Sequence, residues 1–152
     1  MVVQAHKIYQ NTFLAIYSAS TETELEIPLV LNRVNAGFPS PAADFIDDCI
    51  DLNKELIKNK ATTFFIRVLG DSLKEIGIND GDLLIVDKSL SIRNKDIAIC
   101  ILEGEFNVKI VKVESNCAYL ISANDKFNTI KVTAENEFSI WGIVTYSIKK
   151  FR

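Results

Sequence analysis

A serine in a glycine-containing turn is the first feature of this sequence that could perform chemistry. Ser72 lies in the run Gly70-Asp71-Ser72-Leu73, directly after an apolar, β-branched stretch. A serine hydroxyl at such a turn can be exposed, and the backbone N–H groups around it can hold an oxyanion. The run indicates a candidate nucleophile, although a motif this short is a weak signal by itself.

A serine nucleophile needs a base, and histidine does not fit that role here. The same four-residue run occurs in lipases with a Ser–His–Asp triad, which need a histidine near the C-terminus. The sequence contains a single histidine, His6, which lies in the N-terminal region. The sequence therefore argues against a histidine-based hydrolase, and we interpret His6 as a solvated residue.

Lysine can replace histidine as the base if burial lowers its pKa enough to make it neutral. Such a lysine should lie in an apolar strand, and the stretch from Phe106 to Val113 is one. It contains Lys109 and Lys112, which point to opposite faces because side chains alternate along a strand. Both faces are largely apolar, so this pattern leaves either lysine as the candidate base. The alternative is that one or both extend to water.

A proline-rich segment could be a peptide substrate. In the run Asn35-Ala36-Gly37-Phe38-Pro39-Ser40-Pro41, each proline favours an extended conformation for the residue before it. The small residues Ala36 and Gly37 leave the backbone uncovered, and a protease site can accept such a segment as an added strand. On this pattern alone, an ordinary linker is the simpler interpretation.

The elements that must position these residues are expected to be mostly strands. Residues 1–35 show weak periodicity and are interpreted as an extended or mobile arm. A helix is expected over roughly 42–58, where apolar residues follow helical spacing after Ser40 and Pro41. Strands are expected at 62–68, 83–86, 96–102, 106–113, 118–122, 129–133 and 138–148. This order predicts a compact, mainly antiparallel β-fold.

Composition narrows the classes of function. A chain of 152 residues that is 48% hydrophobic allows one compact domain plus an arm, and its net charge of −3 argues against coating nucleic acid. Cys49, Cys100 and Cys117 form no C-x-x-C pair, so we expect small buried residues in a reducing cytoplasm rather than disulfides or a zinc site. No membrane span or signal peptide is recognisable.

Several blocks of the sequence together resemble the UmuD proteins, a family of LexA-like self-cleaving peptidases. The blocks run in order from about residue 27 to the C-terminus: Gly37-Phe38-Pro39-Ser40-Pro41-Ala42-Ala43-Asp44, Ile50-Asp51-Leu52-Asn53, Gly70-Asp71-Ser72, Asp80-Gly81-Asp82-Leu83-Leu84-Ile85-Val86-Asp87, and Gly104-Glu105-Phe106 with Val108-Lys109. Leu73 stands where the family usually has methionine, a change between apolar residues of similar size. The arm before residue 27 has no recognisable match.

The resemblance implies a LexA-like β-rich fold with a Ser–Lys dyad and no cofactor or metal. In the family block Gly-Glu-Phe-x-Val-Lys, the lysine after the valine is the base, which corresponds to Lys109. The backbone N–H groups of Asp71 and Ser72 would form the oxyanion hole. The bond cut in the family corresponds to Ala36–Gly37. The chain then divides into an arm at 1–36 that cleavage removes, a linker and helical segment at 37–60, and a catalytic domain at 61–152.

The resemblance also implies a biological role. A RecA filament on single-stranded DNA would promote self-cleavage during the SOS response to DNA damage. The trimmed homodimer would join a UmuC-type subunit in an error-prone translesion polymerase. It would contact the sliding clamp and bind little DNA directly.

Three other classes of protein share some of these features. A LexA-type repressor needs a helix-turn-helix domain, which the residues before Ala36 do not suggest. A signal peptidase needs a membrane anchor. The alternative from another class is a catalytically silent β-rich module that regulates a polymerase, against which the joint presence of Ser72, Lys109 and Ala36–Gly37 argues.

Overall fold

The computed structural model of the chain describes residues 7–10, 14–18, 26–30 and 46–152. Its elements follow the chain in the order β1 (Lys7–Gln10), β2 (Leu14–Ser18), β3 (Glu26–Val30), β4 (Ile46–Asp51), α1 (Leu52–Leu56), β5 (Thr63–Val68), η2 (Lys74–Ile76), β6 (Leu83–Asp87), β7 (Asp96–Leu102), β8 (Glu105–Val113), β9 (Ala118–Ile121), β10 (Ile130–Val132) and β11 (Phe138–Ile148).

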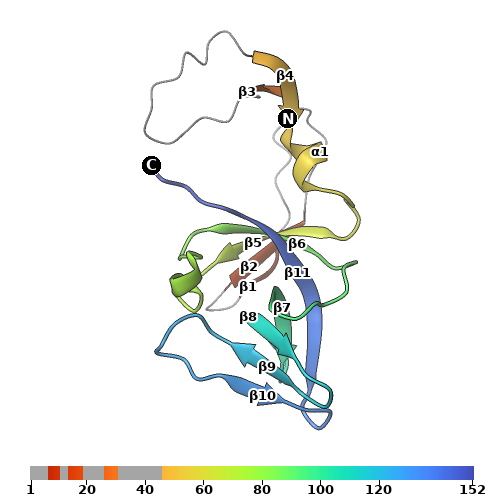
Figure 1. Ribbon diagram of the computed structural model, residues 1–152, viewed down its shortest axis with the longest axis vertical. Coiled ribbons are helices and arrows are strands. Elements are labelled where there is room, and N and C mark those ends of the chain that lie inside the picture. Colours follow the sequence, from red (N-terminus) through yellow and green to blue (C-terminus); the bar gives the residue numbers. More distant parts are fainter. Residues whose placement is uncertain (1–6, 11–13, 19–25, 31–45) are drawn as a thin grey trace.

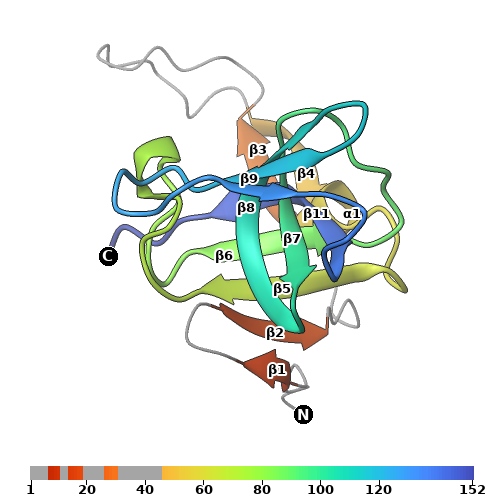
Figure 2. The same cartoon turned by 90° about the horizontal axis from the view of Figure 1, so that it is seen from below.

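Most of these strands form one antiparallel sheet. Its nine strands lie in the order β1-β2-β5-β6-β11-β7-β8-β9-β10, whereas β3 and β4 pair with each other in a separate ladder (Figure 1). Strands β2 and β8 contact each other, although four strands separate them in the sheet order. The sheet therefore curls around a shared core, which the view from below makes visible (Figure 2).

The expected mainly antiparallel β-fold is confirmed. Each stretch that was predicted to be a strand after residue 61 contains one, and β7 and β11 have the predicted bounds. Runs of β-branched residues separated by turn formers are strong local signals, which explains this agreement.

The prediction of a helix over roughly 42–58 is wrong for most of the residues in this range that the structure describes. Residues 46–51 form β4, which pairs with β3, and only Leu52–Leu56 is helical. Residues 42–45 lie outside the described part of the chain. Apolar spacing suited a helix, but pairing with a distant strand overrides such a local preference. Asp51 marks the true helix start, because its side chain accepts a hydrogen bond from the backbone of Asn53 at 2.9 Å.

The N-terminal region is extended where the structure describes it, and its first two strands, β1 and β2, are part of the main sheet. Strand β2 pairs with β5 in the register Leu14↔Val68 to Ser18↔Phe64. Leu14, Ala15 and Ile16 are all buried. Three consecutive buried residues produce no alternation, which explains why this strand was not recognisable from periodicity.

Two buried clusters fill the curled sheet. The larger one includes Leu14, Ile66, Leu84 and Ile99, together with Leu73, which directly follows Ser72 in the chain. The second cluster includes Cys100, in agreement with the prediction of a small core residue. Cys117 is only half-buried, and the side chain of Cys49 lies outside what the structure describes.

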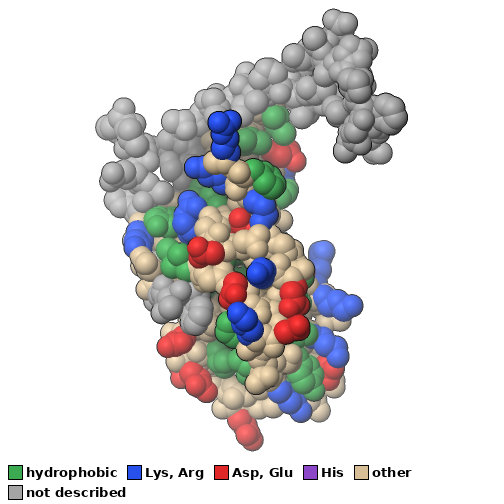
Figure 3. Space-filling view, turned by 90° about the vertical axis from the view of Figure 1, so that its left-hand side faces the viewer, with side chains coloured by type: hydrophobic (Ala, Val, Ile, Leu, Met, Phe, Trp, Pro, Cys, Tyr) green, Lys and Arg blue, Asp and Glu red, His purple; other side chains and the backbone are tan. Residues whose placement is uncertain are grey.

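The molecular surface is of mixed charge where η2 and the loop after β9 lie. Figure 3 shows basic and acidic side chains interspersed on this face, without a continuous basic stripe. Among the described residues, no helix is both long and apolar enough to cross a membrane.

Candidate functional site

Ser72 lies in the turn between β5 and η2. The turn requires a glycine at its start, because Gly70 has φ +95°, a value in the left-handed region that other residues rarely adopt. Leu73 is buried in the larger core cluster and anchors the turn to that core. Ser72 itself is half-buried, so its hydroxyl lies at the boundary between core and solvent.

The turn formed by Asp80, Gly81 and Asp82 supports the Ser72 turn on one side. The backbone N–H of Gly70 donates to Asp80 Oδ1 at 2.7 Å. Backbone hydrogen bonds of 2.9 Å also join Val68 to Asp82 and to Gly81. The conformation of the Ser72 turn therefore depends on this acidic turn.

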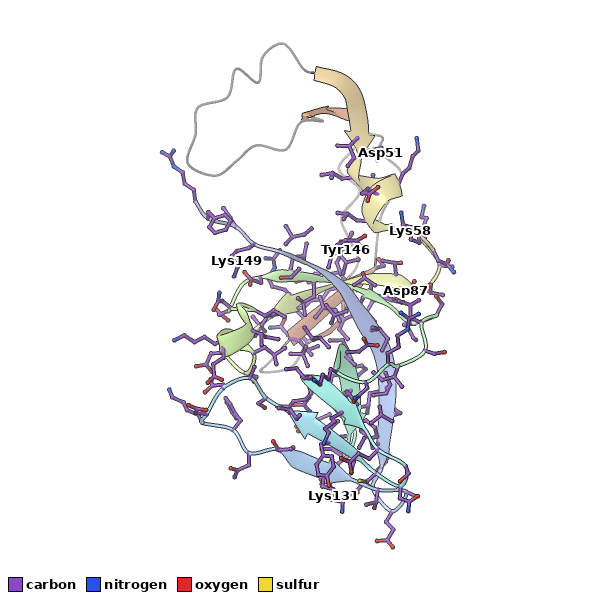
Figure 4. All side chains as sticks on the ribbon, in the orientation of Figure 1. Asp51, Lys58, Asp87, Lys131, Tyr146 and Lys149 are labelled. Carbon is purple, nitrogen blue, oxygen red and sulfur yellow. The ribbon has the colours of Figure 1, made fainter. Side chains whose placement is uncertain are left out.

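Asp82 is a buried carboxylate that stabilises the acidic turn. It accepts hydrogen bonds from the backbone N–H of Asn79 at 2.9 Å and from Lys149 Nζ at 2.8 Å. Burial raises the pKa of Asp82, but these two donors outweigh that effect and leave the pKa below its usual value. Lys149, labelled in Figure 4, thereby connects the end of the chain to the turns around Ser72.

The loop that follows β9 holds the Ser72 turn on its other side. Asn124 Nδ2 donates to the carbonyl oxygen of Asp71 at 2.8 Å. The backbone N–H of Glu75 donates to Ala123 O at 2.9 Å, and the Glu75 carboxylate accepts from the backbone of Asp125 at 3.0 Å. Within the described part of the chain, none of the hydrogen bonds that hold the turn uses the backbone N–H of Asp71 or Ser72. The prediction that these two groups bind an oxyanion is compatible with these hydrogen bonds.

Lys109 is a buried lysine in the middle of β8. It is 8% exposed and lies in the sheet between β7 and β9. Burial is the main cause that lowers the pKa of Lys109, and a charge on the nearby Cys100 would oppose this effect only if that thiol were ionised. Burial also raises the pKa of Cys100 to about 12, so that thiol is neutral near pH 7 and supplies no negative charge to the lysine. Among the described residues, no carboxylate forms an ion pair with Lys109.

The amine of Lys109 is hydrogen-bonded to a second serine. Its Nζ donates to Ser122 Oγ at 2.6 Å, and the ring of Phe127 lies 5.6 Å from the same nitrogen. No hydrogen bond joins Lys109 to Ser72 in the described structure. Sequence reasoning missed Ser122. The β8–β9 register pairs Ile110 with Ile121, which places Ser122 opposite Lys109. Only knowledge of this register would have identified Ser122 as a neighbour of the lysine.

Lys112, the other lysine left open by the strand pattern, lies at the surface. Its Nζ is 2.8 Å from a carboxylate oxygen of Glu114, and its side chain is 47% exposed. The hydrogen bond from Lys112 to Glu114 is the main reason that the pKa of Lys112 is raised. A lysine held in its charged form is a poor base, so the burial pattern favours Lys109 for that role.

One loop therefore contacts Lys109 and the residue directly before Ser72. Ser122 binds the Lys109 amine, and Asn124 holds the backbone of Asp71, next to Ser72. A lysine whose pKa is lowered by burial is suited to activating a serine hydroxyl for nucleophilic attack, once it has lost its proton. The predicted target residues Ala36 and Gly37 lie outside the described residues, as does His6.

The structure also contains a groove that is distinct from this site. Its cavity volume is about 630 Å³, and its lining includes Lys58, Asp87 and Tyr146, which Figure 4 labels. Neither Ser72 nor Lys109 lines it. The carboxylate of Asp87 accepts hydrogen bonds from the hydroxyls of Thr62 and Ser89 at 2.8 and 2.7 Å, which is a structural role.

Comparison with known proteins agrees with this geometry. The Peptidase S24-like family matches residues 28–145, a range that includes both Ser72 and Lys109. Protein SamA of Salmonella typhimurium is 42% identical over 125 residues, which cover 82% of this chain and 86% of SamA. Protein MucA of Escherichia coli is 35% identical over 123 residues, which cover 80% of this chain and 84% of MucA.

A repressor is also among the relatives. The LexA repressor of Colwellia psychrerythraea is 37% identical over 127 residues, which are 83% of this chain but 59% of the repressor. The shared part is thus the peptidase-like region rather than the whole repressor. The chain belongs to the Peptidase S24-like family, as a serine peptidase of the LexA and UmuD kind.

Proposed function

We propose that this chain is a self-cleaving serine peptidase in which Ser72 is the nucleophile, Lys109 is the general base, and the Ala36–Gly37 bond is the main substrate. The observation that carries the proposal is that Lys109 is buried, with no carboxylate partner among the described residues, next to the loop that also holds the Ser72 turn. Burial of this kind favours the neutral amine that a serine nucleophile needs.

The chemistry follows from these groups. The lone pair of the neutral Lys109 amine takes the proton from Ser72 Oγ, which attacks the carbonyl carbon of Ala36. The backbone N–H groups of Asp71 and Ser72 stabilise the oxyanion that forms. The Lys109 ammonium then protonates the departing amine of Gly37, and water, activated by the same lysine, hydrolyses the acyl bond to Ser72 and releases a carboxylate at Ala36.

The hydrogen bond to Ser122 is compatible with this chemistry. A neutral lysine amine has N–H groups to donate and one lone pair to accept a proton. Donation to Ser122 Oγ at 2.6 Å leaves the lone pair for the proton of Ser72. Ser122 therefore acts as a positioning residue, because it restricts where the flexible lysine side chain can place its nitrogen.

We also propose the biological role that the resemblance to the UmuD proteins implies. A RecA filament on single-stranded DNA would stimulate cleavage during the SOS response, and residues 37–152 would serve as a homodimeric accessory subunit of a UmuC-type translesion polymerase in the cytoplasm. The net charge of −3 fits a protein that reaches DNA through its partners, such as the polymerase or its sliding clamp.

The decisive experiment is mass spectrometry of the purified chain after two incubations. One is at pH about 10, where more lysine is neutral, and the other is with RecA, ATP and single-stranded DNA. We expect a fragment that begins at Gly37, and we expect none from Ser72→Ala or Lys109→Ala. A wild-type chain that stays intact under both conditions would contradict the proposal and favour the catalytically silent polymerase-regulating module instead.

Substitution of Ser122 by alanine should change the pH dependence of cleavage. Ser122 Oγ accepts a hydrogen bond that the charged amine donates strongly, so its loss lowers the pKa of Lys109 further. The rise of the cleavage rate with pH should therefore move to lower pH. The rate at high pH should fall by about 10- to 100-fold, because the amine loses its positioning contact.

The matched control for this prediction is Ser122→Thr, which keeps the hydroxyl. It should restore most of the rate and the original pH profile, as measured by the initial rate of fragment formation. If Ser122→Ala and the wild type have the same profile, Ser122 has no positioning role.

A further inference from the structure

The β1–β2 hairpin forms one edge of the main sheet, and it comes from the part of the chain that cleavage would separate. Strand β2 pairs with β5 over five residues, and β1 pairs with β2 from Lys7↔Tyr17 to Gln10↔Ala15. Both strands are red in Figure 2 and extend the sheet beyond β5. In all of these pairings, the residues that belong to the hairpin lie before Ala36.

The hairpin also supplies part of the hydrophobic core. Leu14 is 0% and Ile16 is 1% exposed, and both belong to the same cluster as Ile66 on β5 and Leu84 on β6. Strand β2 additionally contacts β8, the strand that carries Lys109. Loss of the hairpin would expose this cluster and leave the backbone edge of β5 unpaired.

We propose that the hairpin remains bound to the body at residues 37–152 after the Ala36–Gly37 bond is cut. The surface formed by the β5 edge and the core beneath it is then an interaction surface whose occupant is the chain's own N-terminal segment. This inference rests on the proposed cleavage, and it differs from the expectation that the whole arm at 1–36 leaves. The product is a two-chain particle with a complete sheet.

The position of the cut supports retention. The residues of the hairpin that pair and are buried lie between 7 and 18, and their paired partners on the body lie at 64–68, so none of these described contacts involves the bond at 36–37. The body recognises the segment as an added strand through backbone pairing and buried side chains, which is an established mode of peptide binding. A two-stranded hairpin is not stable alone in water, so its release would also unfold it and expose Leu14 and Ile16.

The test uses a cut that does not depend on Ser72 or Lys109. A recognition sequence for a site-specific protease is inserted between Asn35 and Ala36 in the full Ser72→Ala chain, and complete cutting is verified on a denaturing gel. Size-exclusion chromatography with mass spectrometry then follows both fragments. We expect them to elute together at the volume of the uncut chain.

Elution of the N-terminal fragment by itself, at the volume of a free peptide, would overturn the inference. This holds whether the body stays in solution or precipitates. If the protease leaves the inserted site uncut, co-expression of residues 1–36 with a tagged 37–152 chain replaces the cut, and co-purification is the expected result.

Two variants test whether the buried face of the hairpin is responsible. Ile16→Asp places a charge in the core and should release the fragment after the cut. Ile8→Asp changes a residue that is 54% exposed, and the fragment should stay bound. Retention in both variants would contradict the role of the buried face. If the Ile16→Asp chain does not fold before the cut, Ile16→Ala replaces it, with faster release of the fragment on dilution as the expected result.

These outcomes are independent of self-cleavage. If the wild-type chain never cuts itself but the fragment stays bound after the engineered cut, the proposed function is wrong and the binding surface stands. If the wild-type chain does cut itself but the fragment is released, the proposed function stands and the inference of retention is wrong.

Discussion

Replacing Lys109 by methionine is expected to abolish self-cleavage and to leave the chain folded. Methionine has a similar length and fills the same buried position in β8, but it cannot take a proton from Ser72. Removal of the base from such a catalytic unit lowers the rate by about 10⁴-fold or more. The initial rate of formation of the fragment that begins at Gly37, measured in the wild type and the variant, checks this expectation.

The pH dependence of the wild type follows from the same residue. Only the neutral amine of Lys109 is a base, so the cleavage rate should rise as pH increases through its pKa. Burial lowers that pKa, so the rise should occur below the pH at which an ordinary solvent-exposed lysine loses its proton. A rate that does not depend on pH, or that falls as pH rises, would contradict the role of Lys109 as the base.

The same shift has a consequence for stability. The pKa of Lys109 is lower in the folded chain than in the unfolded chain, so the unfolded chain binds more protons between these two values. The stability cost of burying the amine is fully present below the folded pKa and disappears as pH rises towards the unfolded pKa. Lys109→Met should therefore raise the free energy of unfolding at neutral pH, and this gain should shrink at alkaline pH.

Lys112→Met is the matched control on the same strand. Lys112 is exposed and paired with Glu114 at the surface, where such pairs contribute little. Its replacement should change the cleavage rate by less than about twofold and leave the free energy of unfolding nearly unchanged. If Lys112→Met stopped cleavage and Lys109→Met did not, the assignment of the base would have to be reversed.

Truncation of Ile16 to alanine is expected to destabilise the whole domain. Ile16 lies on β2 and is fully enclosed by the larger core cluster. Replacement of a buried isoleucine by alanine costs about 2–5 kcal/mol, which is a large part of the stability of a small domain. Urea denaturation of this variant in the Ser72→Ala background, which prevents self-cleavage, measures the loss.

The control for this prediction lies on the neighbouring strand. Ile8 on β1 is 54% exposed, so Ile8→Ala should change the free energy of unfolding by only about 0.5 kcal/mol or less. Equal, small losses for Ile16→Ala and Ile8→Ala would mean that the N-terminal hairpin does not contribute to the core. A large loss for Ile16→Ala alone would identify the hairpin as part of the catalytic domain rather than an accessory arm.

The agreement between sequence and structure is best where the signals are local. The strands after residue 61 were predicted from β-branched runs bounded by turn formers. The turn before Ser72 was indicated by Gly70, and the structure gives that glycine a left-handed backbone. The disagreement is largest at β4, where helical spacing was present but pairing with β3 decided the structure. Contacts between segments distant in sequence leave no trace in a local pattern, so such errors are expected.

The amino-acid sequence by itself determined which chemistry is available. A serine in a glycine turn, two lysines in an apolar strand and a single N-terminal histidine excluded a histidine triad and left two candidate bases. Its resemblance to a known family then selected Lys109. These conclusions depend on residue types and short spacings, which a sequence contains directly.

Only the tertiary structure decided how these residues are placed. It buried Lys109 and left Lys112 in solvent, although the two faces of β8 look alike as a sequence. It also brought Ser122 to the Lys109 amine, and it made β2 part of the core. The physical reason is that burial and pairing are properties of the curled sheet, whose strands come from distant parts of the chain.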